Sequence, residues 1–417
     1  MSPTDRSSPA GEPRRRVSLL MALACGVSVA NVYFPQALGP LVADGLDLTP
    51  GAAAAVATLT QLGYALGIFL LVPLGDRLPR RPLITTLLAV TACALLVAGL
   101  APAFGVLLAA GTAVGIATVV PQVLLPMAAG LVAPEHRGRI IGTLQGGLIG
   151  GILLARTFGG IAGEHLGWRA PYLIAAALTA LLAVVLARAL PATTASGHER
   201  YPTLLADTLR MLRTEPALRR SALYQAILFG AFSAVWTALA LLITGPRYDL
   251  DTQTVGLLAL IGAAGMFYAP AAGRLVDHHG PARVNLACAL ATLAAASILT
   301  LGTLAGIIGL TALAVGLLLL DVAIQCGQVA NQARIFALRP EARSRLNTAY
   351  MTCSFLGGSA GSWLGVHTYT RLGWPGVCTL AALAAAIVLA IHIASHRPGR
   401  NRAPAKPPAP QPTTATR

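Results

Sequence analysis

The sequence predicts an all-α integral membrane protein whose twelve transmembrane helices form two pseudo-symmetric six-helix bundles. Three observations support this fold class. First, the 417 residues are 55% hydrophobic and only 11% charged, with a mean hydropathy of +0.70, which is more apolar surface than a soluble core of this size buries. Second, apolar runs long enough to cross a bilayer recur along the chain. Third, the second half of the chain repeats motifs of the first.

The apolar runs define the individual helices. A transmembrane helix needs about 20 predominantly apolar residues to cross the hydrocarbon core. The predicted spans are 17–39, 52–74, 83–101, 105–132, 140–162, 168–190, 220–244, 254–273, 284–303, 306–333, 346–366 and 374–394. The first span follows three arginines, as the apolar segment of a signal peptide does. It is long enough to cross the membrane and lacks a clear cleavage site, so we expect it to be retained.

Two motifs occur twice at one fixed separation. PEHRGR at 134–139 returns as PEARSR at 340–345, and the LGW that ends at Trp168 returns as the LGW that ends at Trp374. Both pairs are 206 residues apart. Two membrane-embedded halves that repeat in parallel are typical of carriers in which one half rocks against the other around a central site.

The repeat and the local composition divide the chain into five parts. Residues 17–190 and 220–396 are the predicted six-helix bundles. Residues 1–16 and 397–417 are rich in Pro, Ser, Thr and Arg and are predicted to be disordered tails. The polar linker 191–219 joins the bundles and could serve as a plain tether. It could also lie on the membrane surface, because one helical face carries apolar and small residues, namely Leu204, Leu205, Thr208, Met211 and Leu212.

The net charge of +15 is distributed unevenly between the two sides of the membrane. If both termini share a side, that side carries Arg14–Arg16, Arg77, Arg80, Arg81, Arg137, Arg139, the basic cluster of 188–220, Arg274, Arg283, the basic residues of 334–345 and the C-terminal tail. The other side carries only Arg169, Arg247 and Arg371. The positive-inside rule therefore predicts that both termini are cytoplasmic. Since the basic residues flank apolar spans, they indicate a membrane surface and not a nucleic-acid partner.

Two loops on the arginine-rich side have related sequences. PLGDRLPRRP follows the second span, and GRLVDHHGPARV follows the eighth. Each places an aspartate, Asp76 or Asp277, where a helix reaches the membrane surface, with basic residues about a turn later. A carboxylate there can pair with Arg80 or Arg81, or cap a neighbouring helix N-terminus. Such a contact must break when the two halves move.

These loops resemble the signature of the major facilitator superfamily, which reads Gly, three residues, Asp-Arg, one residue, then Gly-Arg-Arg or Gly-Arg-Lys. The matching positions, expected to form a cytoplasmic gating motif, are Asp76, Arg77, Arg80 and Arg81 in the first copy and Gly273, Asp277, Gly280 and a shifted Arg283 in the second. Val72 and Pro79 replace the two glycines of the first copy. The resemblance covers all twelve spans and implies the fold of that superfamily, secondary active transport by alternating access and a monomeric carrier.

Two further motifs narrow the resemblance. NVYFPQ at 31–36 and TQLGY at 60–64 resemble motifs of the bacterial drug and metabolite efflux branch. This implies a multi-pass protein of the bacterial inner membrane that exports a small molecule against proton entry. Proton antiporters of this branch carry GPxxGG in helix five, whereas this chain has ARTFGG at 155–160. That motif alone therefore does not indicate antiport here.

Two charged residues fall deep within predicted spans, Asp321 in the tenth and Arg156 in the fifth. An ionised group at mid-bilayer costs roughly 2.5–3.5 kcal/mol on insertion scales, so each is a candidate functional residue. Gln325, Gln328 and Gln332 follow Asp321 on one helical face. The resemblance implies that helices one, four, seven and ten line the transport path, which places this face in the cavity.

The acid belongs to one half only, because the 206-residue offset pairs Asp321 with Gly115. A carboxyl group in the membrane interior can bind and release protons as access alternates. Asp321 is therefore the predicted proton-coupling acid, with Arg156 assisting proton release if the two approach each other in one state. The alternative is a static ion pair that joins the two halves.

Other polar and aromatic residues within the spans are candidates for the substrate cavity. They share amide or aromatic side chains and are Asn31, Tyr33, Gln36, Gln61, Tyr64, Gln122, Tyr224, Gln225, Trp236, Gln325, Gln328 and Asn331. Each alone could equally form a hydrogen bond between helices. Together they predict a cavity with few fixed charges, suited to a neutral or amphipathic compound.

Other function classes lack their motifs in this sequence. No GxxxxGKS or GxxxxGKT motif is present, so ATP is not an expected energy source. The six cysteines form no CxxC pair, and neither a metal site nor a cofactor is expected. No catalytic cluster indicates an enzyme, and no large loop indicates a receptor. Proton-coupled or facilitative import of a small metabolite stays open as the alternative to proton-driven efflux.

Overall fold

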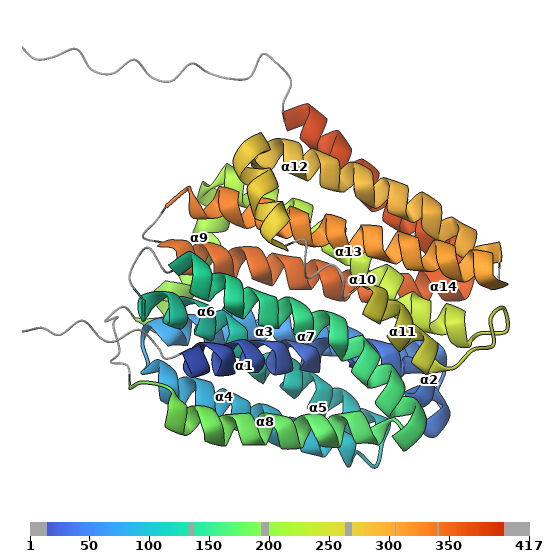
Figure 1. The fold of residues 1–417 in the computed structure, drawn as a ribbon, viewed down its shortest axis with the longest axis horizontal. Helices are drawn as coiled ribbons and strands as arrows, with labels where there is room; N and C mark the ends of the chain where they lie inside the picture. The colour runs from blue at the N-terminus through green and yellow to red at the C-terminus, as the bar shows by residue number, and fades with distance from the viewer. Residues whose placement is uncertain are drawn as a thin grey trace, which may run out of the picture.

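The computed structural model describes residues 15–132, 137–192, 200–262, 269–304, 306–339 and 342–395, and the regular elements in these ranges are helices (Figure 1). The N-terminal half contains α1 (Arg15–Tyr33), α2 (Pro35–Gly45), α3 (Pro50–Leu71), the 3-10 turn η1 (Val72–Asp76), α4 (Arg80–Gly99), α5 (Phe104–Ala117), α6 (Val120–Gly130), α7 (Arg137–Leu166) and α8 (Arg169–Ala189). The linker forms α9 (Tyr201–Thr214). The C-terminal half contains α10 (Pro216–Thr244), α11 (Thr252–Gly262), α12 (Ala269–Thr300), the 3-10 turn η4 (Leu301–Leu304), α13 (Gly306–Phe336) and α14 (Arg343–Ser395).

These elements follow the predicted spans closely. Ten segments of the described chain are long and apolar enough to cross a membrane. The 53-residue α14 turns at Gly373, where φ is 65°, and so contains the eleventh and twelfth predicted spans. In the same way α12 turns at Gly280, where φ is 78°. Positive φ is readily adopted by glycine, which lets the chain reverse there. The predicted eighth span, 254–273, lies partly outside the described residues.

Two helices break at prolines. The first predicted span is divided into α1 and α2 just before Pro35, and the fourth into α5 and α6 just before Pro121. Proline lacks the N–H that would continue the helical hydrogen bonds, so the ladder is interrupted at its position. Membrane helices tolerate such breaks where they face protein or a cavity.

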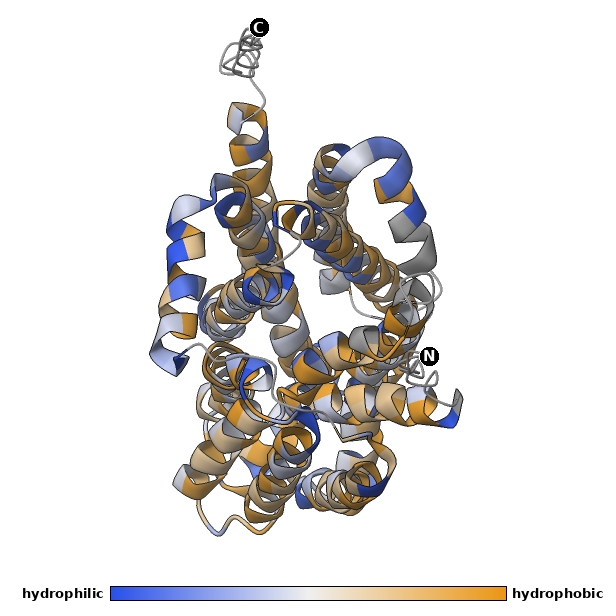
Figure 2. Ribbon diagram, turned by 90° about the vertical axis from the view of Figure 1, so that its left-hand side faces the viewer, coloured by the Kyte–Doolittle hydropathy of each residue, from blue (hydrophilic) through white to orange (hydrophobic). Residues whose placement is uncertain are grey.

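The two halves lie side by side, the N-terminal half in blue and green and the C-terminal half in yellow to red (Figure 1). They meet where α3 packs on α14, α7 on α11, and α2 on α10. Leucines such as Leu181 and Leu383 are more than half exposed on the outer surface. Viewed from the end at which α9 lies, the molecule shows apolar residues along the helices and more polar residues towards their ends (Figure 2). This pattern fits a protein surrounded by lipid.

Glycines set the closest helix contacts, and they do so in the same way in both halves. In the N-terminal half Gly147 of α7 packs against the backbone of Ala22 on α1. In the C-terminal half Gly361 of α14 packs against the backbone of Gly230 on α10. A Cβ at either position would overlap these backbone atoms. Small residues at membrane helix interfaces permit this approach.

We expect Gly147→Ala to destabilise the protein by about 1–3 kcal/mol, because its methyl group has no room against the α1 backbone. Gly146→Ala is the matched control: it is the adjacent residue of α7, and a Cβ there meets no atom within 4 Å. Thermal unfolding of the purified variants in detergent measures the difference. Equal stability of the two variants would contradict the packing described here.

Candidate functional site

The interface between the halves is closed near the ends of α7 and α11. We call the side that carries Arg77–Arg81, Arg339–Arg345 and α9 the arginine-rich face, and the other side the opposite face. Towards the opposite face Glu164 accepts a hydrogen bond of 3.1 Å from the Thr252 backbone N–H and another from the Thr252 hydroxyl. The Thr157 hydroxyl donates to the Gly256 carbonyl oxygen over 2.7 Å. These contacts join the two halves and shut the opposite face.

A second set of contacts extends this closure along α3 and α14. The Thr58 hydroxyl donates to Ser362 Oγ over 3.1 Å, and Ser359 Oγ donates to the Thr58 carbonyl oxygen over 3.0 Å. Nearer the middle of the molecule the rings of Tyr64 and Phe355 meet edge to face, with their centroids 4.5 Å apart. The bonds are short and neutral, so separating them costs little compared with breaking buried ion pairs.

Towards the arginine-rich face the halves enclose a cavity of about 430 Å³ between α6, α7, α13 and α14. Its polar lining is mostly amide and hydroxyl groups, from Gln122, Gln145, Gln328, Gln332, Ser344 and Asn347, with one cation, Arg343. Asn347 links the halves, since its amide nitrogen donates to Gln122 Oε1 over 3.2 Å and its oxygen accepts from Gln332 over 3.3 Å. This cavity is large enough for a small organic molecule.

A much smaller central cavity of about 20 Å³ continues from the larger one and shares Gln122, Leu148, Gln328 and Met351 with it. Its walls combine the aromatic residues Tyr33, Tyr64, Phe229, Phe232 and Phe355 with the amides Gln122, Gln325 and Gln328. None of its lining residues carries a formal charge. The walls therefore favour apolar and hydrogen-bonding groups of a ligand.

The two deep charges lie between the central cavity and the closed opposite face, and Trp236 of α10 contacts both. The guanidinium carbon of Arg156 lies 4.1 Å from the centroid of the Trp236 ring. The Trp236 indole N–H donates a 3.2 Å hydrogen bond to Asp321 Oδ1. Arg156 is 1% exposed and Asp321 3% exposed. The described contacts contain no ion pair within 4.0 Å between Arg156 and Asp321, although the two groups are near enough to interact electrostatically.

The close contacts of the Arg156 guanidinium are aromatic rings and one amide. Its guanidinium also lies 5.2 Å from the centroids of Tyr33 and Phe232, and its Nε donates to Gln36 Oε1 over 3.0 Å. Cation–π attraction is strongest in such a desolvated site. Both Nη atoms of Arg156 and Oδ2 of Asp321 are buried and have no hydrogen-bond partner among the described residues. An unpaired buried polar atom is costly in free energy. A further hydrogen-bonding group at Asp321 and Arg156, or a rearrangement of these side chains, would therefore be favourable.

The structure sorts the predicted cavity residues into three groups. Tyr33, Tyr64, Gln122, Gln325 and Gln328 line the central cavity. Gln36 and Trp236 contact Arg156 instead. The remaining five, Asn31, Gln61, Tyr224, Gln225 and Asn331, are buried away from both cavity linings.

Two residues of the last group show what they contact instead. Asn31 reaches Thr118 and Thr179, both over 3.5 Å, inside the N-terminal bundle. The Tyr224 ring lies 6.1 Å from the His392 ring of α14, about two turns from the arginine-rich end of α10. The position of a helix in the order along the chain does not show which of its faces turns towards the cavity, as α1 and α10 illustrate.

Sequence reasoning missed several residues that the structure brings to the cavities. Phe229, Phe232 and Phe355 resemble ordinary core residues in the sequence, and only the folded position shows that they form a wall. Asn347 lies at the start of the predicted eleventh span, which the superfamily resemblance does not place on the transport path. The sequence did contain a signal for Asn347 as a cavity residue, because it is one of few amide side chains in the C-terminal spans.

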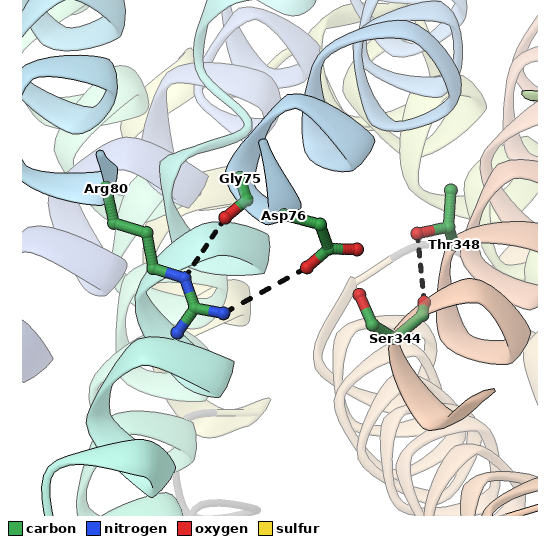
Figure 3. Close-up of polar contacts among 5 residues, drawn as sticks. All are labelled: Gly75, Asp76, Arg80, Ser344 and Thr348. Carbon is green, nitrogen blue, oxygen red and sulfur yellow. Dashed lines mark hydrogen bonds and ion pairs between the residues drawn. The ribbon is translucent and has the colours of Figure 1, made fainter. Parts of the chain in front are cut away.

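The first copy of the gating motif makes the contacts that its sequence suggests. Arg80 Nη2 lies 4.0 Å from Asp76 Oδ1, and Arg80 Nε donates to the Gly75 carbonyl oxygen over 3.2 Å. Arg81 donates to the carbonyl oxygen of Ala187 on α8. The Asp76 carboxylate lies between Arg80 and the first turn of α14, where Thr348 donates to the Ser344 carbonyl oxygen over 3.0 Å (Figure 3). Asp76 thus faces the N-terminal end of a helix from the other half, which favours its negative charge.

The second copy differs. Asp277 and Arg283 are exposed, and neither forms an ion pair with the described residues. Gly280 provides the turn within α12, and Gly273 lies on the same helix. The pseudo-symmetry of the sequence is therefore not matched by symmetric contacts. Asp76 of the first copy faces a helix of the other half (Figure 3), whereas Asp277 of the second copy is exposed.

The linker helix α9 packs against the protein. Leu204, Thr208 and Met211 are buried, whereas Arg210 and Arg213 are exposed. Asp207 forms a 3.0 Å ion pair with Arg345, and Glu215, just after α9, forms a 2.6 Å ion pair with Arg339. The apolar face that could have lain on a membrane surface is turned instead towards α10 and α14.

Comparison with known proteins identifies the family that this architecture suggests. The model of the Major Facilitator Superfamily matches residues 18–324. The chain belongs to the Major Facilitator Superfamily. It is therefore a multi-pass membrane transporter of the secondary type, and its relatives are transporters rather than enzymes. The predicted fold class is confirmed.

Three relatives and one solved structure illustrate the match. The protein named Probable transporter SCO4007 of Streptomyces coelicolor is 38% identical over 94% of this chain and 90% of its own length. The Uncharacterized transporter YgaY of Escherichia coli O157:H7 is 35% identical over 89% of this chain and 94% of its own. A Chloramphenicol resistance protein of Streptomyces lividans is 28% identical over 64% and 67%. The nucleoside transporter NupG has the same fold, with a TM-score of 0.72 at 14% identity, covering 91% of this chain and all of its own.

Proposed function

We propose that this transporter exports a neutral or amphipathic small molecule from the cytoplasm in exchange for protons. The observation that carries the proposal is the layer formed by Asp321, Trp236 and Arg156. It contains a buried acid of one half, a buried cation of the other and an indole that contacts both. Because the two charges come from different halves, any rocking of the halves changes the distance between them.

The proposed coupling follows from that distance. When Arg156 is near, its positive charge favours the ionised form of Asp321 and so promotes release of a proton. When the halves rotate and Arg156 withdraws, the isolated carboxyl group is better accommodated in its neutral form and takes up a proton. Binding and release would then occur on opposite sides of the membrane. No metal or organic cofactor takes part; the energy source is the proton gradient.

The cavity supports the substrate class. Its walls are aromatic and amide groups without a formal charge in the central part, which suits an uncharged or amphipathic compound. Export is favoured by the Chloramphenicol resistance protein among the relatives and by the NVYFPQ and TQLGY motifs. We place the arginine-rich face and both termini in the cytoplasm of a bacterial inner membrane, following the positive-inside rule. In this orientation the larger cavity faces the cytoplasm, where an exporter collects its substrate.

Inverted membrane vesicles test the proposal directly. A panel of uncharged and amphipathic compounds is added outside, and accumulation is measured with and without an inward-acid pH gradient. We expect accumulation of at least one compound that collapses when a protonophore removes the gradient. Accumulation only in right-side-out vesicles would contradict export and support the importer alternative. Accumulation that does not depend on the pH gradient in either inverted or right-side-out vesicles would contradict proton coupling.

A further inference from the structure

Two arginines at the arginine-rich end of the C-terminal half each have a buried nitrogen without an acceptor among the described residues. Arg220 lies in the first turns of α10 and Arg334 in the last turn of α13, and both are half-buried. Nε of Arg220 and Nη1 of Arg334 are buried and have no acceptor among the described residues. Neither side chain forms an ion pair there. The predicted function makes no use of them.

The helices α10 and α13 pack against each other, and the two arginines are near enough for their charges to repel each other. Tyr224 lies one turn after Arg220 on α10, and its hydroxyl is within the electrostatic reach of both guanidinium groups. The Tyr224 side chain is buried, and besides the two arginines the polar side chain of Ser395 lies close to its hydroxyl. The ring of His392, near the end of α14, lies 6.1 Å from the Tyr224 ring. Arg220, Tyr224, Arg334 and His392 are called the cluster below. Arg220 and Tyr224 of α10 and Arg334 of α13 thus bring hydrogen-bond donors from two helices close together.

Three described acids of this face pair with other arginines. Asp207 pairs with Arg345, Glu215 with Arg339, and Asp76 with Arg80. Two like charges that are half-buried without a counter-charge are unfavourable. An anion that accepts hydrogen bonds from both guanidinium groups and from a hydroxyl would remove the repulsion and satisfy the buried donors at the same time. Phosphate oxygens fit guanidinium groups especially well.

The position of the cluster indicates where such an anion comes from. α10 begins here, and α13 and α14 end here, so the cluster lies at the level of the lipid head groups. Basic pockets between transmembrane helices at this depth bind the phosphates of anionic lipids. We propose that Arg220, Arg334 and Tyr224 form a binding site for the phosphodiester of an anionic membrane lipid. The site is separate from the transport cavity and stabilises the C-terminal bundle.

The test uses the purified full-length protein, stripped of lipid in detergent. Thermal unfolding and native mass spectrometry are followed while phosphatidylglycerol, phosphatidylcholine or inorganic phosphate is added. We expect phosphatidylglycerol to raise the melting temperature of the wild-type protein saturably. The double variant Arg220→Gln/Arg334→Gln should bind it at least about tenfold more weakly, the loss expected for charge-assisted hydrogen bonds. The control Arg213→Gln/Arg219→Gln removes the same charge from exposed positions nearby and should bind as the wild type does.

Folding of the double variant is monitored in the same experiment. Without lipid it should melt at or above the wild-type temperature, because the repulsion between the two cations is gone. If inorganic phosphate replaces phosphatidylglycerol and depends on the same two arginines, the anion site stands and its ligand is soluble phosphate. Equal phosphatidylglycerol binding by the wild type and the double variant would overturn the proposal. Equal stabilisation by phosphatidylcholine, which carries no net charge, would overturn it as well.

Discussion

Asp321→Asn is expected to abolish proton-driven accumulation of substrate in inverted vesicles. Asparagine has nearly the same shape and can still accept the hydrogen bond from the Trp236 indole, so the fold and the cavity should persist. It cannot take up or release a proton, and the link between the gradient and the movement of the halves is therefore lost. Substrate should still equilibrate across the membrane, at a rate that no longer depends on the pH gradient.

The control for this experiment is Asp249→Asn. Asp249 is an exposed acid of the C-terminal half, and its backbone φ of 50° is one that asparagine adopts readily. The control should keep the full response to the gradient. If Asp321→Asn accumulates substrate with an undiminished response, the coupling acid lies elsewhere and the proposed role of Asp321 is wrong.

Fixing the opposite face should stop transport almost completely. His165 on α7 and Gln253 on α11 are joined by a 3.1 Å hydrogen bond between their side chains, so cysteines at both positions lie within reach of a short bifunctional thiol reagent. In a background without the six native cysteines, this cross-link holds the two halves in the described state. We expect transport to fall at least about tenfold, because alternating access requires these ends to separate.

Three observations complete the cross-linking experiment. Each single-cysteine variant treated with the same reagent should transport normally. A reagent with a reducible linker should allow activity to return on reduction, which shows that the loss is not due to unfolding. Full transport by a quantitatively cross-linked double variant would mean that α7 and α11 stay together throughout the cycle, and that the opposite face opens elsewhere.

The sequence predicted most of the fold because the bilayer imposes strong constraints on it. Apolar length located the spans. The cost of a charge in lipid singled out Asp321 and Arg156 without any structural information. These features depend on local composition, which can be read from one chain.

The contacts between helices could not be read in the same way. The rotation of each helix about its axis decides which residue faces the cavity, and it follows from packing against neighbours that the sequence does not identify. Tyr224 was therefore assigned to the cavity, although α10 turns it towards His392. The same uncertainty hid the role of Trp236 between the two charges. Asn347 was missed because its contact with Gln122 joins segments that lie 225 residues apart.

The attachment of the linker helix has a mechanical consequence. The two ion pairs formed by described linker residues, Asp207 with Arg345 and Glu215 with Arg339, join the linker to the C-terminal half. Its polar contact with the N-terminal half, as far as the described residues show, is the 2.6 Å hydrogen bond from the Tyr201 hydroxyl to the Leu70 carbonyl oxygen. One neutral hydrogen bond contributes only about 1 kcal/mol. The linker therefore moves together with the C-terminal half. Its hydrogen bond to the N-terminal half opposes the relative movement of the halves by little more than the thermal energy.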